Sequence, residues 1–136
     1  MKEMVKDITE LKSVLDGVVD FVNDVNDYNA GYIEAATQLE LIGAGVEVTS
    51  NGLAEKRITN FKNQWTYIVG KNWIRIVHGD KVYAFVCIDK SPKKKWMKIG
   101  DILRPASNAQ PSLNFNRGNV LVAASWKRYI SKKGII

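Results

Sequence analysis

The sequence contains few of the residues that build metal centres, disulfide frameworks or catalytic pairs. Its 136 residues include a single cysteine, Cys87, and a single histidine, His78. One cysteine excludes an internal disulfide and a cysteine-based zinc cage, and one histidine argues against a histidine metal cluster or a Ser-His or Cys-His pair. We therefore expect no metal, no cofactor and no enzymatic activity, in a reducing cytosolic setting.

Long apolar runs are also missing. No stretch approaches the roughly 18 residues of a membrane span, so we expect no membrane partner. The opening residues MKEMVKDITELKSV carry acids early and lack the apolar centre of a signal peptide. With 46% hydrophobic and 25% charged residues, the chain has the composition and length of one average folded domain. We expect residues 1–136 to form that single domain.

Charge is unevenly divided along the chain. Residues 1–50 contain three basic and ten acidic side chains, whereas residues 51–136 contain seventeen basic and four acidic ones. The overall net charge of +6 conceals this division. The asymmetry favours an acidic scaffold followed by a basic half that binds an anion.

The N-terminal third has a helical pattern. Apolar residues spaced alternately four and three apart form a seam of three heptads: Met4, Ile8, Leu11, Leu15, Val18, Val22 and Val25. This seam packs either on the chain's own core or partly against another subunit. Residues 26–29 predict a break, and a second helix is expected from 30 to 42 before Gly43-Ala44-Gly45. We interpret residues 1–45 as a helical oligomerisation segment.

From residue 64 the apolar period changes to two, which is typical of strands. The predicted antiparallel strands are 65–69, 73–78 and 82–88. Shorter patterns predict a short strand at 46–49, a short helix or loop at 53–63, a strand or strand edge at 96–103, and a strand or helix at 120–130. The fold class is therefore α+β, with N-terminal helices followed by an antiparallel sheet. Residues 46–136 would hold the sheet and a ligand-binding loop.

The irregular segment GDILRPASNAQPSLNFNRGN is the richest in binding chemistry. Arg104 and Arg117 offer planar cations suited to phosphate and to stacking on a base. Phe115 could supply a stacking face, and Asn116 and Asn119 could read base edges or hydroxyls. The alternative is a structural loop whose Phe115 fills the core.

A second basic stretch surrounds Trp96. The lysines at 93–95, bracketed by Lys90 and Lys98, could contact nucleic acid. The alternative is a solvated loop with Trp96 lying on the sheet.

Several short motifs recur in one known family. They are Trp73-x-Arg75-Ile76-Val77, the Gly-Asp and Pro-Ala-Ser elements within 100–107, and Arg-Gly-Asn at 117–119. Over residues 65–120 the chain resembles the first-described phage anti-Thoeris family, the signal-sequestering "sponges". This chain has Asn108 where a tryptophan is expected after Pro-Ala-Ser, and Trp126 is a possible substitute.

The resemblance implies a phage protein that acts in the host cytoplasm. It would hold cyclic ADP-ribose isomers made by bacterial Thoeris TIR enzymes, or cyclic oligonucleotides of CBASS defence at separate sites, without degrading them. The pockets would lie between subunits of a homo-oligomer in which dimers assemble to a hexamer. Carried onto matching positions, the resemblance gives Arg117 phosphate binding and base stacking, Phe115 stacking, and Asn116 and Asn119 polar contacts. The second-line ligand residues are Arg104, Trp73 and Arg75.

Two other classes of function compete with this reading. The basic half is compatible with a small nucleic-acid-binding module, although we favour a pocket ligand over nucleic acid. The acidic helical half could instead be the surface of a phage inhibitor that binds a host protein directly.

Overall fold

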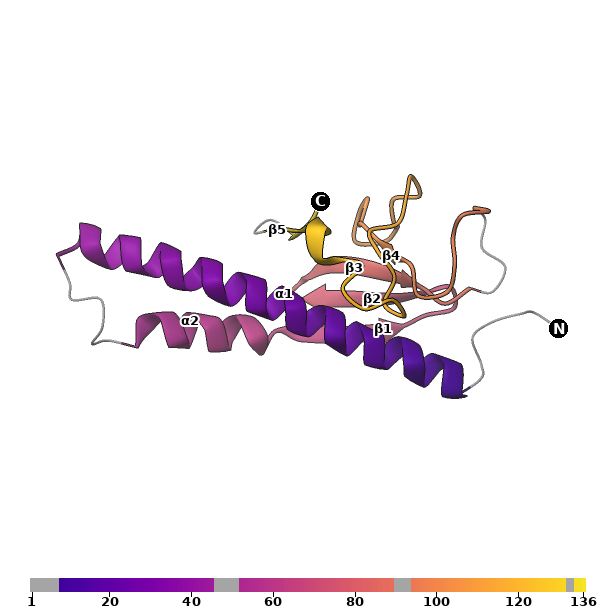
Figure 1. Cartoon of the computed structure of the whole chain (residues 1–136), viewed down its shortest axis with the longest axis horizontal. Coiled ribbons are helices and arrows are strands. Elements are labelled where there is room, and N and C mark those ends of the chain that lie inside the picture. The colour runs from indigo at the N-terminus through magenta and orange to yellow at the C-terminus, as the bar shows by residue number, and fades with distance from the viewer. Residues whose placement is uncertain (1–7, 46–51, 90–93, 132–133) are drawn as a thin grey trace.

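The computed structural model describes residues 8–45, 52–89, 94–131 and 134–136. Two helices come first and an antiparallel sheet follows, so the predicted α+β class is confirmed (Figure 1). The helices are α1 (Ile8–Gly43) and α2 (Leu53–Lys62). The main sheet holds β1 (Trp65–Val69), β2 (Trp73–His78), β3 (Lys81–Cys87) and β4 (Ile102–Leu103). The 3-10 turn η1 (Lys127–Tyr129) and the small hairpin of β5 (Ile130–Ser131) and β6 (Gly134–Ile135) follow.

Helix α1 is continuous for 36 residues, about 54 Å at about 1.5 Å per residue. The predicted break at residues 26–29 is wrong, and the expected second helix is the second half of α1. The polar residues there find partners without interrupting the helix. Asn29 Nδ2 donates to the Val25 oxygen one turn earlier (2.9 Å), and Asn26 Oδ1 accepts from Trp65 Nε1 (2.8 Å). No proline is present to remove a helical hydrogen bond.

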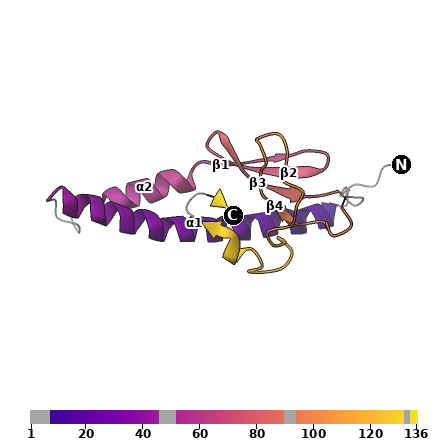
Figure 2. The same ribbon diagram turned by 90° about the horizontal axis from the view of Figure 1, so that it is seen from above.

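The second half of α1 and α2 form a helical hairpin that projects past the end of the sheet (Figures 1 and 2). The ion pair of Arg57 with Glu40 joins the two helices at 2.8 Å, and Arg57 also donates to Thr37 (3.2 Å). Helix α2 bears out the helical alternative for residues 53–63. The strand expected at 46–49 lies outside the described residues.

The sheet order is β1-β2-β3-β4, with antiparallel neighbours throughout. The predicted strands at 65–69 and 73–78 match β1 and β2, and β3 begins and ends one residue earlier than predicted. The segment 96–103 contributes only the two residues of β4. Residues 120–130 form turns and η1 before β5 instead of a longer strand or helix. Their main-chain groups bond over short range, as in Val122 N to Asn119 O and Tyr129 N to Trp126 O.

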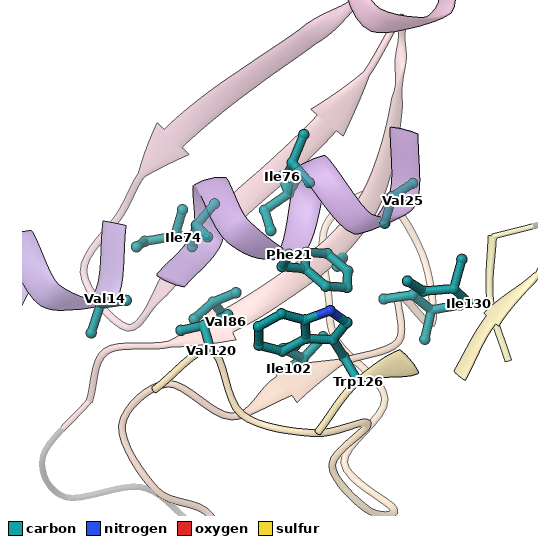
Figure 3. Packing of buried hydrophobic residues seen from close by; sticks show 14 of the residues in the cluster. Val14, Phe21, Val25, Ile74, Ile76, Val86, Ile102, Val120, Trp126 and Ile130 are labelled. Atoms are coloured by element: carbon teal, nitrogen blue, oxygen red, sulfur yellow. The ribbon is translucent and has the colours of Figure 1, made fainter. Parts of the chain in front are cut away.

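The two faces of the sheet are covered by different parts of the chain. One face packs against the first half of α1 (Figure 3). Of the predicted heptad seam, Val18, Val22 and Val25 are buried in the chain's own core, and Leu11 and Leu15 pack against it partly buried. This cluster contains Val14, Val18, Phe21, Val22, Val25, Ile74, Ile76, Ala84, Val86, Ile102, Val120 and Trp126, among others. The other face is covered by the segment after β3, with Phe85, Cys87, Met97 and Leu103 buried together and Trp73, Trp96 and Leu113 partly so.

Gly17 permits the C-terminal segment to lie directly on α1. A Cβ atom there would overlap the main-chain oxygen of Val120 and crowd that residue's carbonyl carbon and side chain. Gly31, in the same helix, has open space around it. Close packing therefore requires a glycine at position 17, whereas it does not require one at position 31.

We predict opposite effects for alanine at these two positions. Gly17→Ala should lower the free energy of unfolding by about 2 kcal/mol, because overpacking outweighs the gain in helix propensity. Gly31→Ala, the matched control, should raise it by about 1 kcal/mol. Urea denaturation of both variants measures the difference, and equal stabilisation by both would contradict the close contact at Val120.

Candidate functional site: an arginine-lined pocket

The loop between β4 and η1 is held by hydrogen bonds from its own asparagines. Asn119 Nδ2 donates to the Ile99 oxygen (3.0 Å) and to Asp101 Oδ1 (2.9 Å). Its Oδ1 accepts from Leu121 N (2.8 Å). Asp101 is buried, and its other oxygen accepts from Lys98 N (2.8 Å). Asn119 thus braces the base of the loop and uses its amide internally.

Asn114 and Asn116 also hold the loop backbone. Asn114 Oδ1 accepts from Phe115 N (2.8 Å) and from Arg117 Nη1 (2.7 Å). Asn116 Oδ1 accepts from Gly118 N (3.1 Å). Gly118 has φ +98°, and a Cβ there would crowd the main chain of Ser125 and Trp126. The loop is therefore pressed against the C-terminal segment.

Arg117 is almost fully buried, at 2% exposure. Its Nη1 donates to Asn114 and to the Phe115 oxygen (2.8 Å), and its Nε donates to the Ile136 oxygen (3.1 Å). The guanidinium carbon lies 3.8 Å from the centre of the Phe115 ring. Burial, and secondly the positive charge of Arg104, lower the pKa of Arg117.

Asn114, Phe115 and Arg117 line a hollow of about 670 Å³, which we call the arginine pocket. Its described lining is Arg104, Asn114, Phe115, Arg117, Arg128, Tyr129 and Ile136. No acidic side chain is among them. Phe115 is 46% exposed, its ring centre 6.4 Å from that of Tyr129. The pocket therefore offers three guanidinium groups and two aromatic rings, a combination suited to an anion joined to a planar group.

Arg128 and Tyr129 complete the pocket and were not predicted as site residues. The Arg128 guanidinium carbon lies 5.0 Å from the Tyr129 ring centre, and Nη2 donates to the tyrosine hydroxyl (2.8 Å). The sequence feature that could have identified them is an arginine followed by an aromatic residue in the basic half. Phe115 and Arg117 were predicted from the same two residue types.

The structure brings together three of the seven predicted ligand residues: Arg104, Phe115 and Arg117. Asn116 and Asn119 are bound to the loop itself and do not line the pocket. Trp73 and Arg75 lie on β2, where Trp73 packs on Phe85 with ring centres 6.3 Å apart. Arg75 also faces Phe85 and donates to the Ala109 oxygen at 3.4 Å. Trp73 therefore packs against the second hydrophobic cluster, and Arg75 lies over Phe85 of that cluster.

Three further residues named from the sequence, Trp126, Asn108 and Trp96, make contacts within the fold. Trp126 is buried against Phe21 and donates from Nε1 to Asp24 (2.8 Å), so it cannot stack on a ligand in place of the residue at 108. Asn108 Oδ1 accepts from Val82 N (3.1 Å). Trp96 is partly buried in the second cluster, which bears out the alternative of a tryptophan lying on the sheet.

The cysteine and the histidine are also held in packed surroundings. Cys87 is fully buried, and burial raises the pKa of its thiol to about 11, so the thiol is protonated at neutral pH. His78 Nε2 lies 2.9 Å from the Phe61 oxygen and donates to it.

Comparison with known proteins adds no relative. No protein-family model, no curated protein and no solved structure matches the chain. Within the described residues, no group of three or more histidine, cysteine or acidic side chains could hold a metal ion. No helix in the described ranges is long and apolar enough to cross a membrane.

We predict that Arg117 supports the loop as well as the pocket. Arg117→Lys should lower the free energy of unfolding by about 2 kcal/mol, because lysine cannot reproduce the three hydrogen bonds of the buried guanidinium. Arg104→Lys, on an exposed side chain of the same pocket, should change it by less than about 0.5 kcal/mol. Urea denaturation compares the two, and equal effects would contradict a structural role for Arg117.

Proposed function

We propose that the protein binds a phosphate-bearing cyclic nucleotide in the arginine pocket and sequesters it without changing it. The observation that carries this proposal is the charge balance of the pocket. Buried charges in proteins are normally paired, yet no described aspartate or glutamate pairs with the buried Arg117. The nearby cation of Arg104 lowers the pKa of Arg117 further, after burial. A bound phosphate would supply negative charge to the three guanidinium groups of the pocket.

The aromatic residues favour a nucleotide over a simple anion. Phe115 is half exposed although Arg117 covers part of its ring, and the ring of Tyr129 lies beside it. The sugar or the base of a nucleotide can pack on such rings while its phosphate meets the guanidinium groups. The resemblance to the anti-Thoeris sponges supports cyclic ADP-ribose isomers as the ligand class, with cyclic oligonucleotides as the second option.

The pocket chemistry favours binding over reaction. Its described lining contains no aspartate, glutamate, histidine or cysteine side chain that could take a proton from a nucleophile at neutral pH. Arginine remains protonated and cannot serve as a base. Sequestration would keep the signal away from its effector, which is the role proposed for this phage protein in the host cytoplasm.

The first test measures cyclic ADP-ribose binding by isothermal titration calorimetry. Arg128→Ala should weaken binding at least about tenfold, because a charge-assisted contact to phosphate contributes about 1.5–3 kcal/mol. Lys94→Ala, an exposed cation outside the pocket, should leave the affinity within about twofold. Ligand released by heat denaturation should be chemically unchanged.

Three outcomes would count against the proposal. Recovery of a linearised or hydrolysed product would make the protein an enzyme. Equal losses for Arg128→Ala and Lys94→Ala, both disappearing at high salt, would instead favour a nucleic-acid-binding surface, since contacts with many phosphates depend steeply on salt. Absence of binding by the wild-type protein to any cyclic nucleotide would overturn the proposal altogether.

We further propose that the protein associates with copies of itself through the second half of α1. Exposed side chains recur there at spacings of four, three, four and three: Tyr28, Tyr32, Ala35, Leu39 and Ile42. Leu39 is 72% exposed and Ile42 63%. This is the spacing of a coiled-coil seam. The flanking positions Gly31, Ala36 and Gln38 are uncharged, so two copies could approach without charge repulsion.

Light scattering tests this association. The wild-type protein should have a mass above the 15.3 kDa of one chain, and Leu39→Lys should reduce it by placing a cation in the apolar stripe. Glu34→Lys, exposed on the same helix but outside the stripe, serves as the control and should leave the mass unchanged. A monomeric wild-type protein would contradict the proposal.

A further inference from the structure

Arg104 also lines a second cavity. It has a volume of about 340 Å³ and is formed where the end of α2, the β2–β3 turn and the C-terminal hairpin meet. We call it the ring cavity, because Phe61, His78 and Tyr83 contribute to its lining. Lys81 and Arg104 add two cations, and no acidic side chain is among its described lining. Its size falls within the range of small-molecule sites.

The aromatic lining is rigidly packed. The ring centres of Phe61 and His78 are 4.1 Å apart, and those of Trp65 and His78 are 4.5 Å apart. Tyr83 packs on Trp65 with ring centres 5.3 Å apart. The hydrogen bond between His78 and the Phe61 oxygen fixes the imidazole. A planar ligand would therefore meet preformed aromatic walls.

Tyr83 carries a polar group that the fold leaves unsatisfied. Its hydroxyl is buried and has no hydrogen-bond partner. Burial, and secondly the neighbouring Tyr28, raise the pKa of Tyr83, so its hydroxyl is protonated and available as a donor. Buried polar groups are nearly always paired, and an unpaired one is a place to look for a ligand atom.

Arg104 connects this cavity to the arginine pocket, because its side chain lines both. It is exposed, and no described residue accepts a hydrogen bond from its guanidinium. A phosphate held at Arg104 would therefore stand at the boundary between the two hollows. Nucleotides are the ligand class that joins a planar, acceptor-rich ring to a phosphate through a sugar.

We propose that one nucleotide spans both hollows, with its base in the ring cavity, an acceptor of the base bonded to the Tyr83 hydroxyl, and its phosphate between Arg104 and Arg128. This rests on the proposed function and adds where the base lies and which residue reads it. Lys81, at the rim, adds positive charge on the side of the base. Specificity for the base then depends on β3 and phosphate affinity on the loop and η1.

The test compares a ligand with a base and one without it. Cyclic ADP-ribose and ribose 5-phosphate are titrated calorimetrically into the wild-type protein and three variants. Tyr83→Phe should weaken cyclic ADP-ribose binding at least fivefold and leave ribose 5-phosphate within twofold. Arg128→Ala should weaken both ligands. Tyr67→Phe, which removes an exposed tyrosine hydroxyl on β1, should affect neither.

Stability separates a ligand contact from a structural role. In the absence of ligand, Tyr83→Phe should keep or raise the melting temperature, because it removes a buried hydroxyl that has no partner. Lower affinity without lower stability is therefore the expected signature. Val82→Phe, which fills the cavity from β3, is a fourth variant and should also weaken cyclic ADP-ribose binding selectively.

The possible failures are distinguishable. If Arg128→Ala weakens cyclic ADP-ribose but Tyr83→Phe and Val82→Phe do not, the base lies elsewhere and this inference is overturned while the proposed function stands. If the wild-type protein binds neither ligand, both are overturned. If Tyr83→Phe weakens the two ligands equally, the hydroxyl does not read the base, and the inference is again overturned.

Discussion

The close contact between Gly17 of α1 and the main chain of Val120 is the constraint on which the rest of the molecule depends. It brings the segment after the binding loop onto the helix, where Trp126 packs edge-on against Phe21 and donates to Asp24. Arg128 and Tyr129 come two and three residues after Trp126. They face the loop that carries Phe115 because this segment lies on α1. A helix face thereby decides where the arginine pocket forms, near the far end of the sequence.

The loop is built so that its cations are held in place without acidic partners. Asparagine side chains bond the backbone of the loop, and Asp101 is occupied by Lys98 N and Asn119. The arginines are thus left facing a hollow whose described lining has no aspartate or glutamate side chain. Such an arrangement costs stability, since like charges are gathered and one of them is buried. A bound phosphate would offset this cost, which is the physical basis of the proposed anion binding.

The two halves of the chain divide the work in a way that the charge distribution anticipates. The acidic half supplies α1, and with it one wall of the core and the longer helix of the projecting hairpin, while the basic half supplies the pocket. The apolar stripe on the projecting hairpin is separate from the pocket lining. Different substitutions should therefore affect the proposed self-association and the proposed ligand binding.

Local patterns in the sequence were sufficient for the fold class, for β1 and β2, and for singling out the 100–119 segment, which supplies four of the residues that line the arginine pocket. Alternation of side chains predicts strands because it depends only on neighbours along the chain. The helix break at 26–29 could not be judged this way, because Asn26 finds its partner on Trp65, 39 residues later.

The site required the tertiary structure for the same reason. The residue types of Arg117, Phe115 and Arg104 predicted anion and base binding. Nothing local showed that the side chain of Asn119 holds the base of the loop. Nor did it show that Trp73 and Arg75 lie beside Phe85 in another cluster. Arg128 and Tyr129 join the pocket only because the chain returns over α1 at Gly17. Sequence alone determined which chemistry was available; long-range packing decided which of those groups face the same hollow.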